Sequence, residues 1–477
     1  MSANTALTEL GNHQTLAVVG AAWGDEGKGK IVDCLSPGFD LVARYDGGAN
    51  AGHTIFLPNG SQVICHQIPS GVASFKECVI GPAVKLDPAR LLKEYQEIAQ
   101  VVGEMPPLHI DRRCGVVLPW HSAIERSLER CRDREIGTTK SGQGPMAGTR
   151  AMRFSILVSD ILGPKDKLVQ RLGEFHRAFR DQIESADPNQ LSPLEVAEQL
   201  RWYADFLGPR AQDTSFLLFK RWEEGNRILF EGAQATMLDA LAGTYPFTSV
   251  GMSTAAGVAY GLCLPPKVVQ AVLLVTKLFP TRVGAGPMPS EFGDRQEAEE
   301  FPKAHQELFV GGPWRENFLR ETLSAINSGQ ASRVQHSQYL QVLQGELGAT
   351  TGRGRSPGDP DMPVLRYAAR VNGADYLALT RLDSATGLAK IPVVVDYRLN
   401  GQGVAHGQMP DTDDLYRVQP VYEQLAGWTE SIDGCTEEEE LPPEALEVVR
   451  FHERATDRPV VLVGTGPGRE SIIGREV

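Results

Sequence analysis

Short runs of consecutive apolar residues recur along the chain and alternate with longer amphipathic stretches. Because the apolar residues follow one another without the alternation of a half-exposed strand, these runs are typical of buried parallel strands. The predicted strands are residues 16–20, 228–230, 268–275, 376–379 and 460–463, with a possible sixth strand at 41–45.

Two of the amphipathic stretches begin with helix start signals. Asp87 stands where it can cap a helix whose apolar positions recur at helical spacing. Residues 192–195, with the sequence SPLE, have the spacing of a capping box with proline at the first helical position. Buried strands that alternate with such helices predict an α/β fold, with a mostly parallel central sheet flanked by helices in a single large domain.

Polar and glycine-rich segments follow four of the predicted strands. Open parallel sheets place their ligand sites beyond the carboxyl ends of the strands. The four segments are residues 21–30, 231–234, 380–383 and 464–469. We therefore expect these separated loops to line one cleft.

Composition excludes several classes of protein. The 477 residues are 42% hydrophobic and 22% charged, which is enough for a large buried core. A net charge of −13 disfavours a general binder of nucleic acid or anionic membranes. The seven cysteines are scattered singly, and the chain shows neither a secretory signal nor an apolar run of about 18 residues. We expect a soluble cytoplasmic protein that keeps its thiols reduced.

The first predicted strand runs into a glycine- and lysine-rich loop, residues 24–30, with the sequence GDEGKGK. Glycines let backbone N–H groups approach phosphate oxygens, and Lys28 and Lys30 add full positive charges. The loop nearly matches a P-loop, but Ile31 stands where a P-loop needs Ser or Thr to hold magnesium. Asp25 offers the metal a carboxylate instead. This P-loop-like unit predicts a polyphosphate site, with a structural strand-to-helix turn as the alternative.

A second glycine-rich segment, residues 46–54 with the sequence DGGANAGHT, follows the possible strand at 41–45. It is too rich in glycine to be a helix face or a packed strand, so we expect a loop suited to close ligand approach. A lone histidine is usually structural. His53 in such a loop is a candidate acid–base group, because histidine gives or takes a proton near neutral pH.

A series of short motifs resembles the adenylosuccinate synthetase family in order and spacing, over nearly the whole chain. A single match could arise by chance, but so many in one order are specific. The motifs are WGDEGKGK at 23–30, GGANAGHT at 47–54, IPSG at 68–71, IGTT at 136–139, QGP at 143–145, FEGAQATMLD at 230–239, GTYPF at 243–247, TRVGAGPMP at 281–289, GATTGR at 348–353, TRLD at 380–383 and GTGPGR at 464–469.

The resemblance implies a ligase reaction in two steps. A nucleoside triphosphate, normally GTP, phosphorylates O6 of inosine monophosphate (IMP), and the nitrogen of L-aspartate then displaces that phosphate from carbon 6. The resemblance further implies that Asp25 removes the N1 proton and binds Mg²⁺, with help from the main-chain carbonyl of Gly52. It makes His53 the general acid and places Lys28 among the catalytic residues.

The resemblance also implies three sets of binding residues. The purine monophosphate would contact Asn50, Thr139, Gln234, Ser249 and Arg353, together with Arg153 from a neighbouring subunit, which implies a homodimer. L-Aspartate would contact Ala349, Thr350, Thr351, Arg353 and Arg355. GTP would contact Gly24, Glu26, Gly27, Lys28, Gly29, Lys30, Arg355, Arg381, Asp383, Gly464, Thr465, Gly466 and Pro467.

The sequence departs from the family pattern near two of these sets. A carboxylate such as Asp383 suits the adjacent N–H donors of guanine, which favours GTP. Arg381 and Gly464 replace the family's usual lysine and serine at the base-binding wall, so ATP remains an alternative. Gly354 replaces a basic residue, and residues 356–363 depart from the usual continuation of the aspartate loop. We expect a reshaped aspartate pocket.

We take residues 1–14 as an N-terminal extension and residues 15–477 as one domain. Within it, residues 293–347 are longer than we expect for the family, and this insertion would cover the site or build a partner surface. Three other functions stay open. A related ligase could use another purine monophosphate such as dGMP, although the viral branch that does so typically has a smaller neutral residue in place of Asp25. Asp25, Lys28 and His53 oppose a non-catalytic nucleotide-binding regulator, since binding alone would not require that acid–base pair. A simple NTPase or kinase would have no use for an aspartate-binding loop.

Overall fold

The predicted strands lie side by side in one ten-stranded sheet. The computed structural model describes residues 10–57, 59–133, 135–186, 189–347 and 354–476. The strand order is β19-β18-β14-β11-β1-β10-β2-β5-β7-β9, and all neighbours pair in parallel except β18 and β19. The strands are β1 (Thr15–Gly20), β2 (Leu41–Arg44), β5 (Glu77–Ile80), β7 (Leu108–Asp111), β9 (Ala211–Gln212), β10 (Ile228–Glu231), β11 (Ala271–Lys277), β14 (Tyr376–Thr380), β18 (Val460–Gly464) and β19 (Ile472–Gly474).

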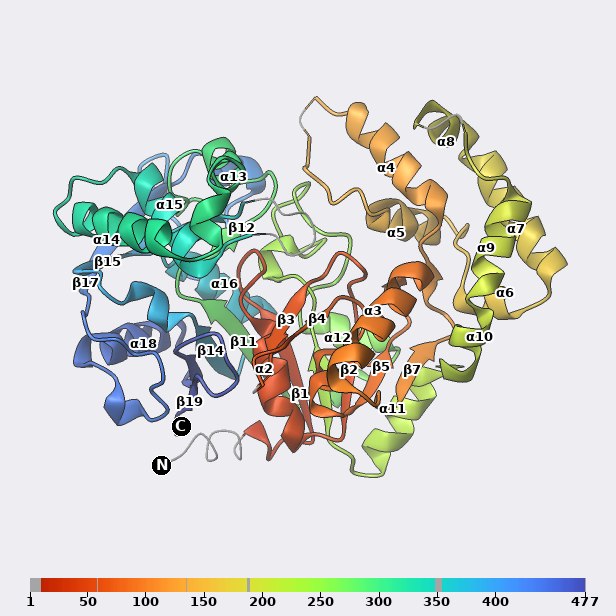
Figure 1. The fold of residues 1–477 in the computed structure, drawn as a ribbon, viewed down its shortest axis with the longest axis horizontal. Coiled ribbons are helices and arrows are strands. Elements are labelled where there is room, and N and C mark those ends of the chain that lie inside the picture. The colour runs from red at the N-terminus through yellow and green to blue at the C-terminus, as the bar shows by residue number, and fades with distance from the viewer. Residues whose placement is uncertain (1–9, 58, 134, 187–188, 348–353, 477) are drawn as a thin grey trace.

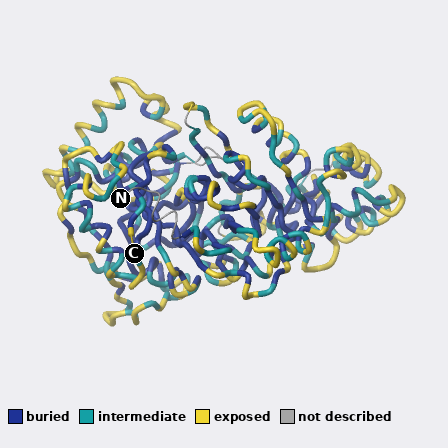
Figure 2. Tube along the Cα trace, turned by 90° about the horizontal axis from the view of Figure 1, so that it is seen from below, coloured by how far each residue is buried: buried dark blue, intermediate teal, exposed yellow. Residues whose placement is uncertain are grey.

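The apolar runs are buried because both faces of the sheet are covered. Ala17 and Val19 of β1 pack into one apolar cluster. Leu16 and Val18 pack into another, together with residues of helix α2 (Lys28–Leu35). Figure 2 shows the buried residues running through the centre of the molecule and the exposed ones on the outer helices and loops. The α/β fold with a mostly parallel sheet flanked by helices is therefore confirmed (Figure 1).

One predicted strand began too early. Residues 266–268 form a 3-10 helix, and β11 starts only at Ala271. Pro265 and Pro266 explain the delay, because proline has no N–H to donate to a strand ladder and fixes φ near −65°.

Both predicted helix starts are confirmed. The Asp87 carboxylate accepts the backbone N–H groups of Ala89 and Arg90 at 3.1 Å. Ser192 and Glu195 form the reciprocal capping box. The helices are α2 (Lys28–Leu35), α3 (Pro88–Val102), α4 (Pro119–Arg130), α5 (Gln143–Ala151), α6 (Val158–Leu162), α7 (Lys165–Ala178), α8 (Arg180–Ala186), α9 (Pro193–Trp202), α10 (Ala204–Leu207), α11 (Thr214–Glu223), α12 (Ala256–Leu262), α13 (Arg295–Ala304), α14 (Pro313–Asn327), α15 (Arg333–Gln344), α16 (Met362–Asn372), α17 (Thr412–Leu415) and α18 (Pro443–Thr456).

Small sheets and helices surround the main sheet. The stretch expected as an insertion folds as α13, α14 and α15. These helices lie together beside the three-stranded antiparallel sheet formed by β15, β16 and β17 (Figure 1). None of the helices described is long and apolar enough to cross a membrane. The remaining strands are β3 (His53–Phe56), β4 (Gln62–Cys65), β6 (Lys85–Leu86), β8 (Gly115–Val116), β12 (Thr281–Arg282), β13 (Ser356–Pro357), β15 (Lys390–Leu399), β16 (Gln402–Gly403) and β17 (Gln419–Ala426).

Candidate active site

Loops at the carboxyl ends of the central strands line one cleft of about 650 Å³. All four predicted loops contribute to it, as does the segment around His53. The lining includes residues 23–25, 27–30, 50–54, 136–139, 234, 247–250, 344–347, 355, 380–381 and 466–467.

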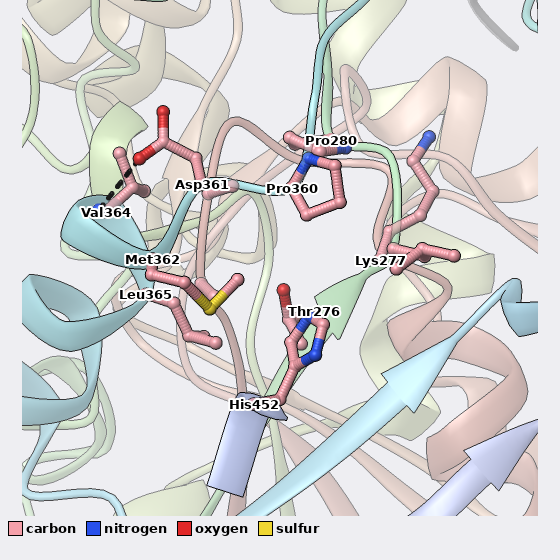
Figure 3. A pocket seen from close by; sticks show the side chains of 12 residues that line it. Thr276, Lys277, Pro280, Pro360, Asp361, Met362, Val364, Leu365 and His452 are labelled. Atoms are coloured by element: carbon pink, nitrogen blue, oxygen red, sulfur yellow. Dashed lines mark hydrogen bonds between the residues drawn. The ribbon is translucent and has the colours of Figure 1, made fainter. Parts of the chain in front are cut away.

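A second pocket is lined by Thr276, Lys277, Asp361 and His452 among others (Figure 3). Its volume is about 10 Å³, which is room for no more than one water molecule. Of these two, only the cleft, which carries the phosphate loop in its lining, has room for a nucleotide.

The side chain of Glu26 fixes the shape of the phosphate loop between β1 and α2. Its buried carboxylate accepts the backbone N–H groups of Ala22 at 3.1 Å and Gly24 at 2.9 Å, and pairs with Lys28 Nζ at 2.6 Å. Gly24, Asp25 and Gly27 all have φ between 60° and 93°, the left-handed region that favours glycine. Glu26, expected at the triphosphate, thus lies under the loop and outside the cleft lining.

Asp25 forms the end of a row of alternating charges. Its Oδ2 lies 2.7 Å from Arg355 Nε, Arg355 Nη1 donates to Glu346 at 2.9 Å, and Glu346 accepts from Lys277 Nζ at 2.8 Å. Burial would raise the pKa of Glu346, but Lys277 and Arg355 hold it at about 2. Burial lowers the pKa of Lys277 although Glu346 counters it. The row joins Asp25, the expected base, to Glu346 near the end of the stretch expected as an insertion.

His53 also lines the cleft and begins strand β3. The expectation that it sits within a glycine-rich loop was wrong by one residue, because the loop ends at Gly52 and His53 pairs with Cys65 of β4. His53 Nδ1 lies 2.5 Å from Glu231 Oε1. Burial, with the Arg44 charge beside it, lowers the pKa of His53.

The phosphate loop and β3 touch directly. A Cβ atom on Gly29 would lie only 2.6 Å from His53 Cβ, so only glycine allows this approach. The contact brings Lys28 and His53 to one wall of the cleft.

The loop at residues 464–469 is fastened to α2 at two points. Lys30 Nζ donates to the carbonyl oxygens of Gly466 at 2.6 Å and Ser471 at 2.9 Å, and burial lowers its pKa to about 8. Arg469 forms two bonds to Asp33, at 2.6 and 2.8 Å. Lys30, expected at the phosphates, therefore bonds the main chain of this loop.

The residues expected around the base of the triphosphate are partly brought together. Arg381 lines the cleft beside Gly466 and Pro467. Asp383 Oδ1 is buried and has no hydrogen-bond partner among the residues described, and burial raises the pKa of Asp383. Such a carboxylate oxygen suits an N–H donor of a ligand. Asp383, Gly464 and Thr465 lie outside the cleft lining; Gly464 ends β18 and Thr465 is buried.

The residues expected at the purine monophosphate fall into three groups. Asn50, Thr139, Gln234 and Ser249 line the cleft. Arg153 does not, since it lies exposed just beyond α5. Arg353 lies outside the described residues, as do Ala349, Thr350 and Thr351, which were expected at the L-aspartate site.

Sequence reasoning missed Glu231, Glu346, Lys277 and Arg44, which hold the expected side chains in place. Glu231 stands inside the motif at 230–239, and Glu346 stands just before the motif at 348–353. These positions are the only sign in the sequence that the two residues belong near the site. Gln143 was also missed as a site residue. Its buried amide lines the cleft, with neither polar atom paired to another described residue.

The residues present fit a magnesium ion. Mg²⁺ takes oxygen ligands and usually keeps waters and substrate phosphates beside one or two carboxylates. Asp25 and Gly52 both line the cleft and offer a carboxylate and a main-chain carbonyl. Within the described ranges there is no group of three or more His, Cys, Asp or Glu side chains that could hold a metal by itself.

Comparisons with known proteins agree in naming one family. The family model for adenylosuccinate synthetase matches residues 17–473. An adenylosuccinate synthetase from Picosynechococcus sp. is 35% identical over 464 residues, covering 96% of this chain and 94% of the relative. The structure of fully ligated adenylosuccinate synthetase from Plasmodium falciparum matches with a TM-score of 0.81 and 29% identity, over 97% of this chain and 100% of that one. A cyanophage S-2L succinoaminodeoxyadenylate synthetase, bound to dGMP and dATP, shares the fold with a TM-score of 0.56 and 18% identity, over 97% and 95% of the two chains.

Proposed function

Because the chain belongs to the adenylosuccinate synthetase family, we propose that its cleft joins L-aspartate to IMP through a 6-phosphoryl intermediate, with GTP as phosphoryl donor. The protein is a carbon–nitrogen ligase of purine nucleotide biosynthesis that forms adenylosuccinate. The observation that carries the finer proposal is the convergence of Asp25, Lys28 and His53 on one cleft.

Asp25 and His53 divide the proton chemistry. Asp25 takes the proton from N1 of the purine, which makes O6 a nucleophile toward the γ-phosphoryl group. His53 stabilises that group from Nε2, because Nδ1 is already engaged by Glu231. Lys28 adds a positive charge at the same wall, where its partner Glu26 sets its position.

Arg355 has a second role in this scheme. Its guanidinium lies against Asp25, so it also sets the charge beside the proposed base. Arg355 serves the carboxylates of L-aspartate and the triphosphate, together with Ala349, Thr350, Thr351 and Arg353. A guanidinium suits both partners because its planar fork pairs bidentately with carboxylate or phosphate.

Mg²⁺ would be held by Asp25 and the carbonyl of Gly52. The ion supplies charge neutralisation for the triphosphate oxygens during transfer. The base of the triphosphate lies against Arg381 and Pro467, and the unpaired Asp383 oxygen supports guanine over adenine.

A second copy of the chain completes the monophosphate site. Arg153 lies outside the cleft of its own subunit and is exposed, with Met152 exposed beside it. We assign Arg153 to the 5′-phosphate of the partner subunit's IMP, so the working unit is a homodimer. We place it in the cytoplasm, in keeping with seven cysteines that are all free. We keep residues 1–14 as an extension and 293–347 as an insertion in the domain 15–477.

A substrate matrix tests the proposal. Purified protein receives L-aspartate and Mg²⁺ with IMP, GMP or dGMP, each with GTP or ATP, and phosphate release and succino-nucleotide formation are followed together. We expect adenylosuccinate with IMP and GTP. Phosphate release without a succino-nucleotide would reject the ligase, and a faster reaction with dGMP would transfer the activity to the alternative monophosphate.

A further inference from the structure

We propose that Glu231 is a positioning residue that fixes the ring of His53 for phosphoryl transfer; this rests on the proposed role of His53. Glu231 does not line the cleft, and it touches neither of the two proposed nucleotide sites. It would act only through the imidazole.

The sheet itself brings the groups together. Glu231 ends β10 and Arg44 ends β2, and the two residues are direct partners in the parallel register. His53 begins β3 a few residues after β2. Ser70 lies in the 3-10 turn Ser70–Ser74, which packs on both β2 and β3.

Both oxygens of the Glu231 carboxylate are engaged. Oε1 accepts from Arg44 Nη2 at 2.5 Å, His53 Nδ1 at 2.5 Å and Ser70 Oγ at 2.7 Å. Oε2 accepts the backbone N–H of Ser70 at 2.7 Å. The side chain is fully buried, so the carboxylate is fixed in one orientation.

This arrangement selects one tautomer of His53. The Arg44 guanidinium lies 3.1 Å from Nδ1 but has only N–H donors, so it cannot accept a proton from the ring. Glu231 is the acceptor at that nitrogen, which places the ring hydrogen on Nδ1 and leaves Nε2 for the cleft. A hydrogen bond to one ring nitrogen commonly sets the role of the other. The charged groups around the ring are Arg44 from β2, Glu231 from β10 and Lys28 from α2.

Glu231→Gln would keep the shape of the side chain but would no longer select one tautomer of His53. Its amide can turn either an oxygen or an NH₂ group toward Nδ1, so both tautomers become allowed. The same change removes the partner of the buried Arg44 charge, which costs stability. A matched control must therefore remove a similar buried carboxylate elsewhere.

Asp111 supplies that control. It is fully buried, ends β7, pairs with Arg113 at 2.8 Å, and accepts both the hydroxyl and the backbone N–H of Thr214. This pattern repeats the arginine, hydroxyl and backbone N–H around Glu231. Asp111 has no contact with His53, so Asp111→Asn measures what loss of such a network does to the fold alone.

The decisive experiment is a double-mutant cycle on kcat with Glu231→Gln and His53→Gln. Glu231→Gln should lower kcat by about 10²-fold, within the range of acid–base contributions, and change KM for IMP by less than about threefold because ground-state binding is untouched. In the His53→Gln background the same change should lower kcat by less than about twofold. Asp111→Asn should lower the melting temperature similarly and leave kcat unchanged.

Losses that multiply in the double mutant, or an equal fall of kcat in Asp111→Asn, would overturn the proposal. Ser70→Ala keeps the carboxylate charge and covers the case in which Glu231→Gln does not fold. It should lower kcat moderately, and only while His53 is present; an equal loss in the His53→Gln background would count against the proposal.

A spectroscopic readout separates this inference from the proposed function, because it needs no turnover. The ¹⁵N ring shifts of His53, assigned by their loss in His53→Gln, should show a protonated Nδ1 in the wild type and in Asp111→Asn. Glu231→Gln should show a mixture of tautomers. A bare Nδ1 in the wild type would refute the inference even if the protein makes adenylosuccinate, whereas a protonated Nδ1 without any product would refute only the function.

Discussion

Asp25 is held by charge, and His53 is held by geometry. Asp25 is a partly exposed carboxylate paired with the guanidinium of Arg355. His53 is buried and bonded through Nδ1 to Glu231. Replacing the two side chains should therefore have different structural costs but the same functional result.

We expect Asp25→Ala and His53→Ala to fold and to lose turnover, each by about 10²–10⁴ in kcat. Asp25→Ala removes the N1 base and a magnesium ligand, and His53→Ala removes the group facing the phosphoryl oxygens. Steady-state rates of succino-nucleotide formation, with melting curves as the folding control, check this. Full rate in either variant would reject the role assigned to that residue.

Single side chains also show where sequence reasoning stops. Asp25, Lys28 and His53 could be named because each stands in a glycine-rich segment suited to ligands. Their partners could not, since Glu231 is 178 positions from His53 and only the strand register brings the two together. A motif identifies residue types that lie close together in the sequence. Contacts between residues on different strands cannot be predicted in this way from one sequence.

At the scale of elements, the strands were predictable because burial on both faces requires continuous apolar runs. The start of β11 was predicted wrongly, because Pro265 and Pro266 favour a 3-10 helix where the apolar run alone indicated a strand. The placement of the loop at residues 464–469 was also beyond prediction, because it depends on bonds to α2 from residues more than 400 positions away.

The tie between this loop and α2 predicts a selective defect. Arg469→Gln removes the bonds to Asp33 and should raise KM for the triphosphate by about tenfold, which corresponds to about 1.4 kcal/mol, because the loop that meets the base loses its anchor. KM for IMP should stay unchanged. Initial-rate kinetics with each substrate varied in turn test this, and equal shifts in both KM values would contradict it.

Helix α4 carries a pH-dependent cap. His121 Nδ1 accepts the backbone N–H of Leu118 at 2.8 Å, and burial lowers the pKa of His121 to about 3. The folded state therefore holds neutral His121, while the unfolded chain takes up a proton below its ordinary value near 6.5. The stabilisation is complete above that value and is lost as pH falls toward 3.

His121→Gln should flatten this dependence. Unfolding free energies from denaturant titrations at several pH values from about 7 down to about 4 should fall less steeply for the variant than for the wild type. His305→Gln is the control, because His305 is exposed. Equal slopes for wild type and His121→Gln would remove His121 from the acid response.

At the scale of the whole molecule, the fold and the family followed from the sequence, whereas assembly stays a prediction. Motif order along one chain reports the fold. A subunit interface requires a second copy, and the only signal for it was the resemblance that assigned Arg153 across it. Its exposed position, away from the cleft of its own chain, is consistent with that assignment.

Mixing two inactive variants tests the dimer. Asp25→Ala damages the cleft of its own chain, and Arg153→Leu damages the cleft of the partner. In a mixed dimer one of the two sites then receives both damaged residues and the other receives none. Equal mixing with free exchange should restore about a quarter of wild-type activity. Activity no higher than that of the separate variants, with mixed dimers demonstrated by mass, would place Arg153 outside a shared site.

The row from Lys277 to Asp25 ties together four positions that lie far apart in the sequence. Its charges alternate in sign and cancel in pairs, and they come from β11, from the residues just after α15, from Arg355 and from the phosphate loop. A substitution that removes one of these charges leaves its neighbour in the row unbalanced. We therefore expect the four positions to tolerate change only in combination.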